Sequence, residues 1–255
     1  MKEILNINYD SRYVDICNLD MYLPDVEKPC PVFIYFHGGG LESGSKELSN
    51  ELKSITNNNI AIVSVEYHKY PNAKYPDFIL DAAKAIEFIF KYNEEKQVFS
   101  DYFIGGSSAG AYIAMMLYFN PSYLKSYGID LSKITGWFFN SGQPTVHFNV
   151  LKEKGLDPRL VRIDEAAPIY YIDKDIDLKK HAELMFVLAE EDVPGRLEET
   201  HLLINAMCRF NYDMSKVTLR VVPGCKHCGY KIQEIVVEFI QKAIFNKKYP
   251  NLIII

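Results

Sequence analysis

The pattern of apolar and polar positions along this chain predicts buried strands that alternate with helices. A continuous apolar run predicts a strand buried on both faces at 32–36, and a second buried strand is predicted at 60–65. Further strands are predicted at 99–104, 134–140, 184–188 and 217–222. Amphipathic or strongly apolar segments predict helices at 46–56, 77–92, 109–119, 196–208 and 234–245. Alternating segments at 3–9 and 14–23 predict an antiparallel edge. The expected class is α/β, with three layers: a mostly parallel sheet of about eight strands and helices on both faces.

The interval 141–183 is longer than a simple crossover between strands needs. We expect one structural helix there, together with a short excursion from the sheet. Two interpretations stay open. The excursion is either a packed surface loop or a short cap insertion, within one domain spanning 1–255, that forms part of a substrate pocket.

A single G-x-S-x-G runs from Gly106 to Gly110, with Ser108 at its centre. A serine on a sharp turn between a strand and a helix projects its hydroxyl clear of the sheet. The two glycines leave room beside the strained backbone, and the helix N-terminus behind Ser108 favours a negative charge in front of it. The motif alone is weak evidence, because Gly and Ser are common in turns. A catalytic role therefore depends on partners elsewhere in the chain.

An acyl-transfer serine needs a histidine base and an acid that orients this base. His227 lies between the last predicted strand and the closing helix, in a short turn rich in small residues. Asp192 follows a buried strand, with Glu190 and Glu191 as close rivals. The carboxyl ends of parallel strands meet at one edge, so we expect Ser108, Asp192 and His227 to converge there. The alternatives are a structural histidine and a solvated acidic turn.

Three consecutive glycines, Gly38 to Gly40, follow His37 after a buried strand. Their large cost in chain entropy indicates backbone amides that must approach a ligand closely. The amides of Gly39, Gly40 and Ala109 could hold a developing oxyanion. A phosphate-binding turn or a tight connection are alternatives, although no G-x-x-x-x-G-K or G-x-G-x-x-G motif accompanies the run.

Composition excludes several other classes of function. The net charge of −5 offers no basic surface for nucleic acid. No segment approaches the ~18 consecutive apolar residues of a membrane span. The first residues contain no hydrophobic signal core, and we expect a cytoplasmic protein that binds no membrane.

The five cysteines are an odd number, which argues against a disulfide framework. Cys225-Lys226-His227-Cys228 is compatible with a metal knuckle or a redox pair. No second cysteine or histidine cluster completes a four-ligand zinc site, so we expect neither a metal nor a cofactor.

The His-Gly-Gly-Gly run, the serine turn and the chain order Ser…Asp…His resemble the α/β-hydrolase superfamily. Within it, the chain is similar to the esterase/lipase group related to hormone-sensitive lipase and to small carbohydrate-ester and aryl-ester hydrolases. The likeness covers nearly the whole chain, including segments at 19–24, 66–82 and 167–169. The resemblance implies an α/β-hydrolase fold and the following roles: nucleophile Ser108, base His227, acid Asp192, and oxyanion amides from Gly39, Gly40 and Ala109.

The chain departs from this group at Ser107, Ala111 and Leu41, where members often carry Asp, Gly and an aromatic residue. Because the predicted fold begins within the first ten residues, we also expect no long N-terminal cap. We therefore expect an open site that cleaves short-chain acyl, aryl or carbohydrate esters through an acyl-enzyme. An amide or peptide hydrolase on the same triad, arylformamidase-like or prolyl-peptidase-like, is the alternative enzyme. A non-catalytic binding protein on this fold is the alternative outside enzymes.

The tail at 249–255 ends in four apolar residues. Exposed, such a tail would favour association. It either packs on its own domain or contacts a second copy in a homodimer.

Overall fold

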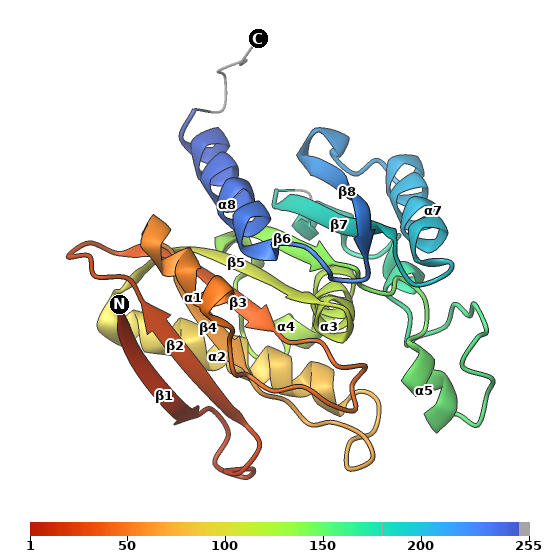
Figure 1. Ribbon diagram of the computed structural model, residues 1–255, viewed down its shortest axis with the longest axis horizontal. Coiled ribbons are helices and arrows are strands. Elements are labelled where there is room, and N and C mark those ends of the chain that lie inside the picture. Colours follow the sequence, from red (N-terminus) through yellow and green to blue (C-terminus); the bar gives the residue numbers. More distant parts are fainter. Residues whose placement is uncertain (180, 250–255) are drawn as a thin grey trace.

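The computed structural model describes residues 1–179 and 181–249. Within these residues an eight-stranded sheet has the order β1-β2-β4-β3-β5-β6-β7-β8 (Figure 1). Strands β3 to β8 are parallel, whereas β2 is antiparallel to β1 and β4. The predicted α/β class and its antiparallel edge are confirmed. The strands are β1 (Lys2–Asn8), β2 (Asn18–Leu23), β3 (Cys30–Phe36), β4 (Ala61–Val65), β5 (Phe99–Ser107), β6 (Ile134–Asn140), β7 (Glu183–Glu191) and β8 (Val217–Lys226).

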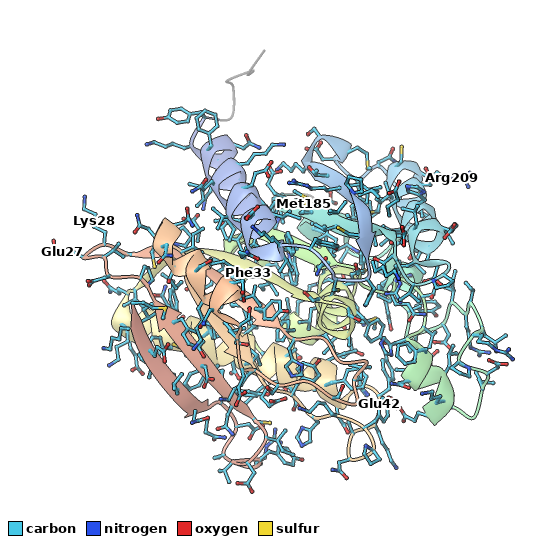
Figure 2. The ribbon with its side chains drawn as sticks, viewed as in Figure 1. Glu27, Lys28, Phe33, Glu42, Met185 and Arg209 are labelled. Carbon is cyan, nitrogen blue, oxygen red and sulfur yellow. The ribbon has the colours of Figure 1, made fainter. Side chains whose placement is uncertain are left out.

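Helices cover both faces of the sheet and bury its apolar side chains. On one face α8 packs over the sheet, where Phe33 and Met185 lie in the same apolar cluster (Figure 2). On the other face α2 and α3 pack against a larger cluster, and all residues of α3 are buried, as its apolar composition predicts. The α-helices are α1 (Asn50–Lys53), α2 (Asp77–Lys96), α3 (Ala109–Phe119), α4 (Ser122–Lys125), α5 (Phe148–Glu153), α6 (Ile176–Lys179), α7 (Arg196–Arg209) and α8 (Ile232–Lys248).

The strand order reverses between β3 and β5. The chain leaves β3 toward β4 on one side and returns as β5 on the other, so the loops that follow β3 and β5 are neighbours. Phe36, at the end of β3, is in register with Gly106 in β5. In open α/β sheets a crevice forms at such a reversal, outside the carboxyl ends of the strands. Two segments lie at this reversal: the glycine loop (Gly38 to Leu41), which follows β3, and the serine turn (Gly106 to Gly110), which ends β5 and begins α3.

Several predicted elements differ from the structure at their ends, and three of these differences have a local cause. The helix predicted at 46–56 is shorter: Ser49 caps α1, which continues as a 3-10 turn at Ser54–Asn58. The strand predicted at 14–23 begins only at Asn18, because residues 10–17 form hydrogen-bonded turns. The last strand continues past 222, since Lys226 still pairs with β7.

The interval 141–183 contains more regular structure than we expected. It holds α5, a 3-10 turn at Pro168–Tyr171 and α6, rather than one helix. Figure 1 shows α5 away from the two helical layers, on the side to which β3 and β5 point. In the described part of the chain no helix is both long and apolar enough to cross a bilayer. The tail beyond 249, on which the homodimer expectation rests, lies outside the described residues.

Candidate active site

The backbone at Ser108 is held in an unusual conformation between β5 and α3. Its φ of 53° and ψ of −114° lie outside the regions that L-residues favour. The Ser108 N–H donates to the carbonyl of Asn140 at 2.7 Å, which ties the turn to β6. Side chains at the flanking glycines would not fit. A Cβ on Gly106 would lie 2.5 Å from the Phe36 carbonyl oxygen, and one on Gly110 would lie 2.0 Å from it. The glycines of the motif are therefore a steric requirement of this turn.

Ser108, His227 and Asp192 lie in hydrogen-bonded series. The Nε2 atom of His227 is 3.0 Å from Ser108 Oγ, and its Nδ1 atom is 2.5 Å from Asp192 Oδ1. Ser108 follows β5, Asp192 follows β7 and His227 follows β8, all at the carboxyl end of the sheet. The carboxylate is 2% exposed and the imidazole 30% exposed. The base is thus open to substrate on one side, while the acid beneath it is shielded from water.

Asp192 is held as a carboxylate by several donors. Its oxygens accept hydrogen bonds from the Ser141 hydroxyl and from the backbone amides of Ala189 and Val193. Burial raises the pKa of Asp192, but the hydrogen bonds from His227, Ser141 and these amides outweigh it and lower this pKa to about 2. An anion at this position favours the protonated form of the neighbouring ring.

The two rival acids do not contact His227. The Glu190 carboxylate accepts a hydrogen bond from the backbone N–H of Gly224, at 2.8 Å. Glu191 lies in β7, where its backbone is paired with Lys226. The structure therefore places Asp192, and neither rival, beside the imidazole.

The imidazole of His227 is a stronger base than free histidine. The hydrogen bond to Asp192, and next the contact with Cys228, raise the pKa of His227 to about 9 against the opposing effect of burial. Such a ring readily accepts the proton of a hydroxyl that becomes a nucleophile. It must first be neutral, which ties its use as a base to alkaline pH.

The glycine loop lies directly against the serine turn. A Cβ on Gly38 would be 3.4 Å from the Cβ of Ser108. Gly39 and Gly40 have φ of 113° and 65°, which favour glycine. Among the described residues, the N–H groups of Gly39, Gly40 and Ala109 donate to no protein acceptor. These three N–H groups are thus not used by the hydrogen bonds of the fold.

Comparisons with known proteins show what this chain is similar to. The model of the family BD-FAE matches residues 19–125, which include the glycine loop and the serine turn. The chain is 32% identical over 130 residues to "Probable carboxylesterase 1" of Arabidopsis thaliana, an alignment that covers 42% of this chain and 41% of that protein. The chain thus spans about two fifths of the length of this curated relative.

Solved structures match almost the whole chain. A "truncated form of carbohydrate esterase from gut microbiota" superposes with a TM-score of 0.74 and 18% identity, over 95% of this chain and 96% of that one. A hyperthermophilic esterase from the archaeon Pyrobaculum calidifontis superposes with a TM-score of 0.67 and 18% identity, over 97% and 84%. The chain has an α/β-hydrolase fold. At these identities the structural likeness shows the fold alone.

His37 anchors the glycine loop to the body of the protein. Its Nε2 atom is 3.0 Å from Glu66 Oε1, and its ring stacks on Tyr67 with 4.4 Å between centroids. The Tyr67 hydroxyl donates to the His37 carbonyl at 2.7 Å. Burial raises the pKa of Glu66, but hydrogen bonds from His37 and Lys69 outweigh it and lower this pKa to about 2. The glycine loop therefore follows a histidine that is held by the Glu66 carboxylate and by Tyr67.

A polar network beneath the triad was not apparent from the sequence. Asn140 donates to Ser107 Oγ at 2.9 Å and accepts from the Tyr230 hydroxyl. The buried Arg196 donates to the Ser141 carbonyl at 2.7 Å. The one signal in the sequence was the polar pair Asn140-Ser141 at the end of an apolar strand. This network fixes the end of β6, to which both the serine turn and Asp192 are bonded.

The described residues contain one group of side chains whose ligand atoms lie close enough to share a metal ion. Cys17, His68 and Asp81 place these atoms within 4.8 Å of one another. In the structure they bond to each other instead: both N–H groups of His68, backbone and ring, donate to Asp81 Oδ2 at 2.8 and 2.7 Å. Cys225 and Cys228, which flank His227, are free thiols outside this group.

Proposed function

We propose that this α/β-hydrolase is a serine hydrolase that cleaves carboxylic esters through an acyl-enzyme intermediate. The observation that carries the proposal is the unbroken hydrogen-bond series from Ser108 Oγ through His227 to Asp192. The unpartnered amides beside Ser108 support it, because ester cleavage requires donors for a developing oxyanion.

The chemistry follows from these positions. Ser108 Oγ attacks the ester carbonyl while His227 Nε2 takes its proton, and Asp192 stabilises the resulting imidazolium. The N–H groups of Gly39, Gly40 and Ala109 bind the tetrahedral oxyanion. The imidazolium then protonates the leaving alcohol. In the second half His227 removes a proton from water, the hydroxide attacks the acyl carbonyl, and return of the proton to Ser108 Oγ releases the acid.

The proposed substrates are short-chain acyl, aryl or carbohydrate esters. The similar proteins include one named as a probable carboxylesterase and one named as a carbohydrate esterase, which supports esters of these kinds. The partial exposure of His227 is compatible with a bulky soluble alcohol group. We further propose that 141–183 forms a short cap within one domain, since α5 packs beside the glycine loop: a Cβ on Gly40 would lie 3.1 Å from the Phe148 ring.

A cytoplasmic setting is part of the proposal. Its support is that all five cysteines are free thiols. Stable disulfides mark oxidising compartments, and free thiols fit a reducing one.

The test is a substrate panel with a matched variant. Purified protein is assayed with p-nitrophenyl esters of rising acyl length, with acetylated and feruloylated sugars, and with the corresponding anilides. We expect ester turnover that the Ser108→Ala variant loses while it keeps the thermal stability of the parent. Preferred cleavage of anilides would favour an amidase, and a parent that cleaves none of these substrates would refute the proposed reaction.

A further inference from the structure

Four successive carbonyl groups of the glycine loop are each bonded to a donor. The Gly38 carbonyl accepts from His37 Nδ1 at 2.7 Å, and the Gly39 carbonyl accepts from the backbone N–H groups of residues 42 and 43. The Leu41 carbonyl accepts from the backbone N–H of Tyr70, at 2.7 Å. These three carbonyls are thus held by the loop itself or by the chain that follows β4.

The Gly40 carbonyl is held from a different part of the molecule. It accepts from Asn149 Nδ2 at 2.5 Å, and Asn149 belongs to α5 in the 141–183 segment. Figure 2 shows Glu42, which directly follows the loop, beside α5, and Lys152 of that helix lies 3.7 Å from the Glu42 carboxylate. The loop is therefore tethered at this point by α5.

The direction of these carbonyls controls the direction of the amides. In a trans peptide the C=O and the N–H of one unit point in opposite directions. Fixing the carbonyls of Gly38 and Gly39 therefore aims the N–H groups of Gly39 and Gly40 away from the body of the loop. The Gly40 carbonyl sets the next peptide unit, at the point where Gly40 and Leu41 both have φ of 65°. Without its tether, the torsions of Gly40 would be the least restrained in the loop.

The side chain of Asn149 is buried and held in place. It is 2% exposed, and its backbone N–H is capped by His147 Nδ1 at 3.2 Å. Its Oδ1 atom is buried and accepts from no group in the described part of the chain. The side chain is therefore held through its Nδ2 donor, which bonds to the Gly40 carbonyl.

We propose that Asn149 is a positioning residue for the glycine loop. Through Asn149, α5 holds the amides of this loop in the conformation that binds the oxyanion. This inference rests on the proposed ester-hydrolase function. Asn149 donates hydrogen bonds to His147 and Gly40, and within the described residues no hydrogen bond joins it to the triad. Its effect should therefore appear in transition-state binding rather than in substrate binding.

The test compares Asn149→Ala and Asn149→Asp with two controls on the same helix. Lys152→Met removes the exposed ion pair to Glu42 and leaves Asn149 in place. Val150→Ala loosens the buried face of α5, because Val150 is fully buried, and also keeps Asn149. For each variant, kcat and KM for p-nitrophenyl acetate, the inhibition constant of a trifluoromethyl ketone transition-state analogue and the melting temperature are measured.

We expect both Asn149 variants to lose about 10-fold in kcat, less than the ~10²–10³ that loss of one oxyanion donor costs. KM should stay close to the parent value, and affinity for the ketone should fall by the same factor as kcat. Lys152→Met should match the parent, and Val150→Ala should lose melting temperature but not kcat.

Two results would overturn the inference. One is an active Asn149→Asp protein with parental kcat and ketone affinity. The other is a Val150→Ala protein that loses kcat as much as the Asn149 variants do at an equal loss of melting temperature, which would assign the effect to helix stability. A parent protein without ester turnover would refute the proposed function, and the role of Asn149 would fall with it.

Discussion

The hydroxyl of Ser141 donates a hydrogen bond of 2.7 Å to Asp192 Oδ2, while the other carboxylate oxygen faces His227. One group directly after β6 and one on the loop after β8 thereby orient the acid that follows β7. The carboxylate cannot rotate away from the imidazole without losing the Ser141 bond as well. This arrangement distinguishes Asp192 from its acidic neighbours and leads to the first prediction.

Replacing Asp192 by Asn should lower kcat by about 10⁴-fold, the cost of a wrong tautomer in serine triads of this type. The amide would hold the His227 ring with its proton on the nitrogen that must accept the proton of Ser108. Glu191→Gln is the matched control, because it removes one negative charge next to Asp192 without touching the imidazole. Steady-state kinetics of both variants on an aryl ester measures the difference. An inactive Glu191→Gln variant beside an active Asp192→Asn variant would show that Asp192 is not the acid.

The raised pKa of His227 predicts how activity depends on pH. The ring acts as a base only when neutral, so kcat/KM should rise with pH and level off only above the pKa of about 9. In Asp192→Asn the first cause of the raised pKa is gone, and the pKa should fall toward the ordinary value of histidine. A pH profile of the parent and an NMR titration of the His227 ring in both proteins measure this shift. Equal ring pKa values in the two proteins would contradict it.

Gly40→Ala should impair catalysis more than it impairs folding. The new Cβ would lie 3.1 Å from the Phe148 ring, at a φ of 65°. Gly155 is the matched control, since its φ is 71° and a Cβ there meets nothing within 4 Å. Both variants should lose about 1–2 kcal/mol of stability from the left-handed backbone. Only Gly40→Ala should lose kcat, and Phe148→Ala should restore part of it. Parallel melting curves and kinetics check this; equal kcat losses in both glycine variants would count against a role for the loop.

Much of the fold followed from local patterns. The continuous apolar run at 32–36 forms most of β3, and α3 begins and ends where its apolar composition predicts. The end of β8 could not be predicted in this way, because Pro223 and Gly224 resemble a stop signal. Pairing of Lys226 with Glu191 on the neighbouring strand carries β8 past them. The helix predicted from 46 begins only at Asn50, for a similar reason. The backbone N–H of Lys46 donates to Glu66, which is distant in the sequence.

In the candidate site, too, some residues could be predicted from local sequence and others could not. Ser108, Asp192 and His227 could be named from residue type and position after predicted strands. Their supports could not, because Ser141 and Asn149 act only through the spatial order of strands and the placement of α5. Nothing in the local sequence marks Asn149, which lies in the irregular interval after β6.

The account depends most on Ser108 being the activated nucleophile. Intact-mass analysis after treatment with a fluorophosphonate tests this directly, because the reagent bonds only to a serine whose proton is removed by a base. We predict one adduct per chain, located on Ser108, absent from Ser108→Ala, and formed in step with loss of ester turnover. An adduct on another residue, or a protein that hydrolyses esters at full rate after Ser108 is replaced, would contradict the account.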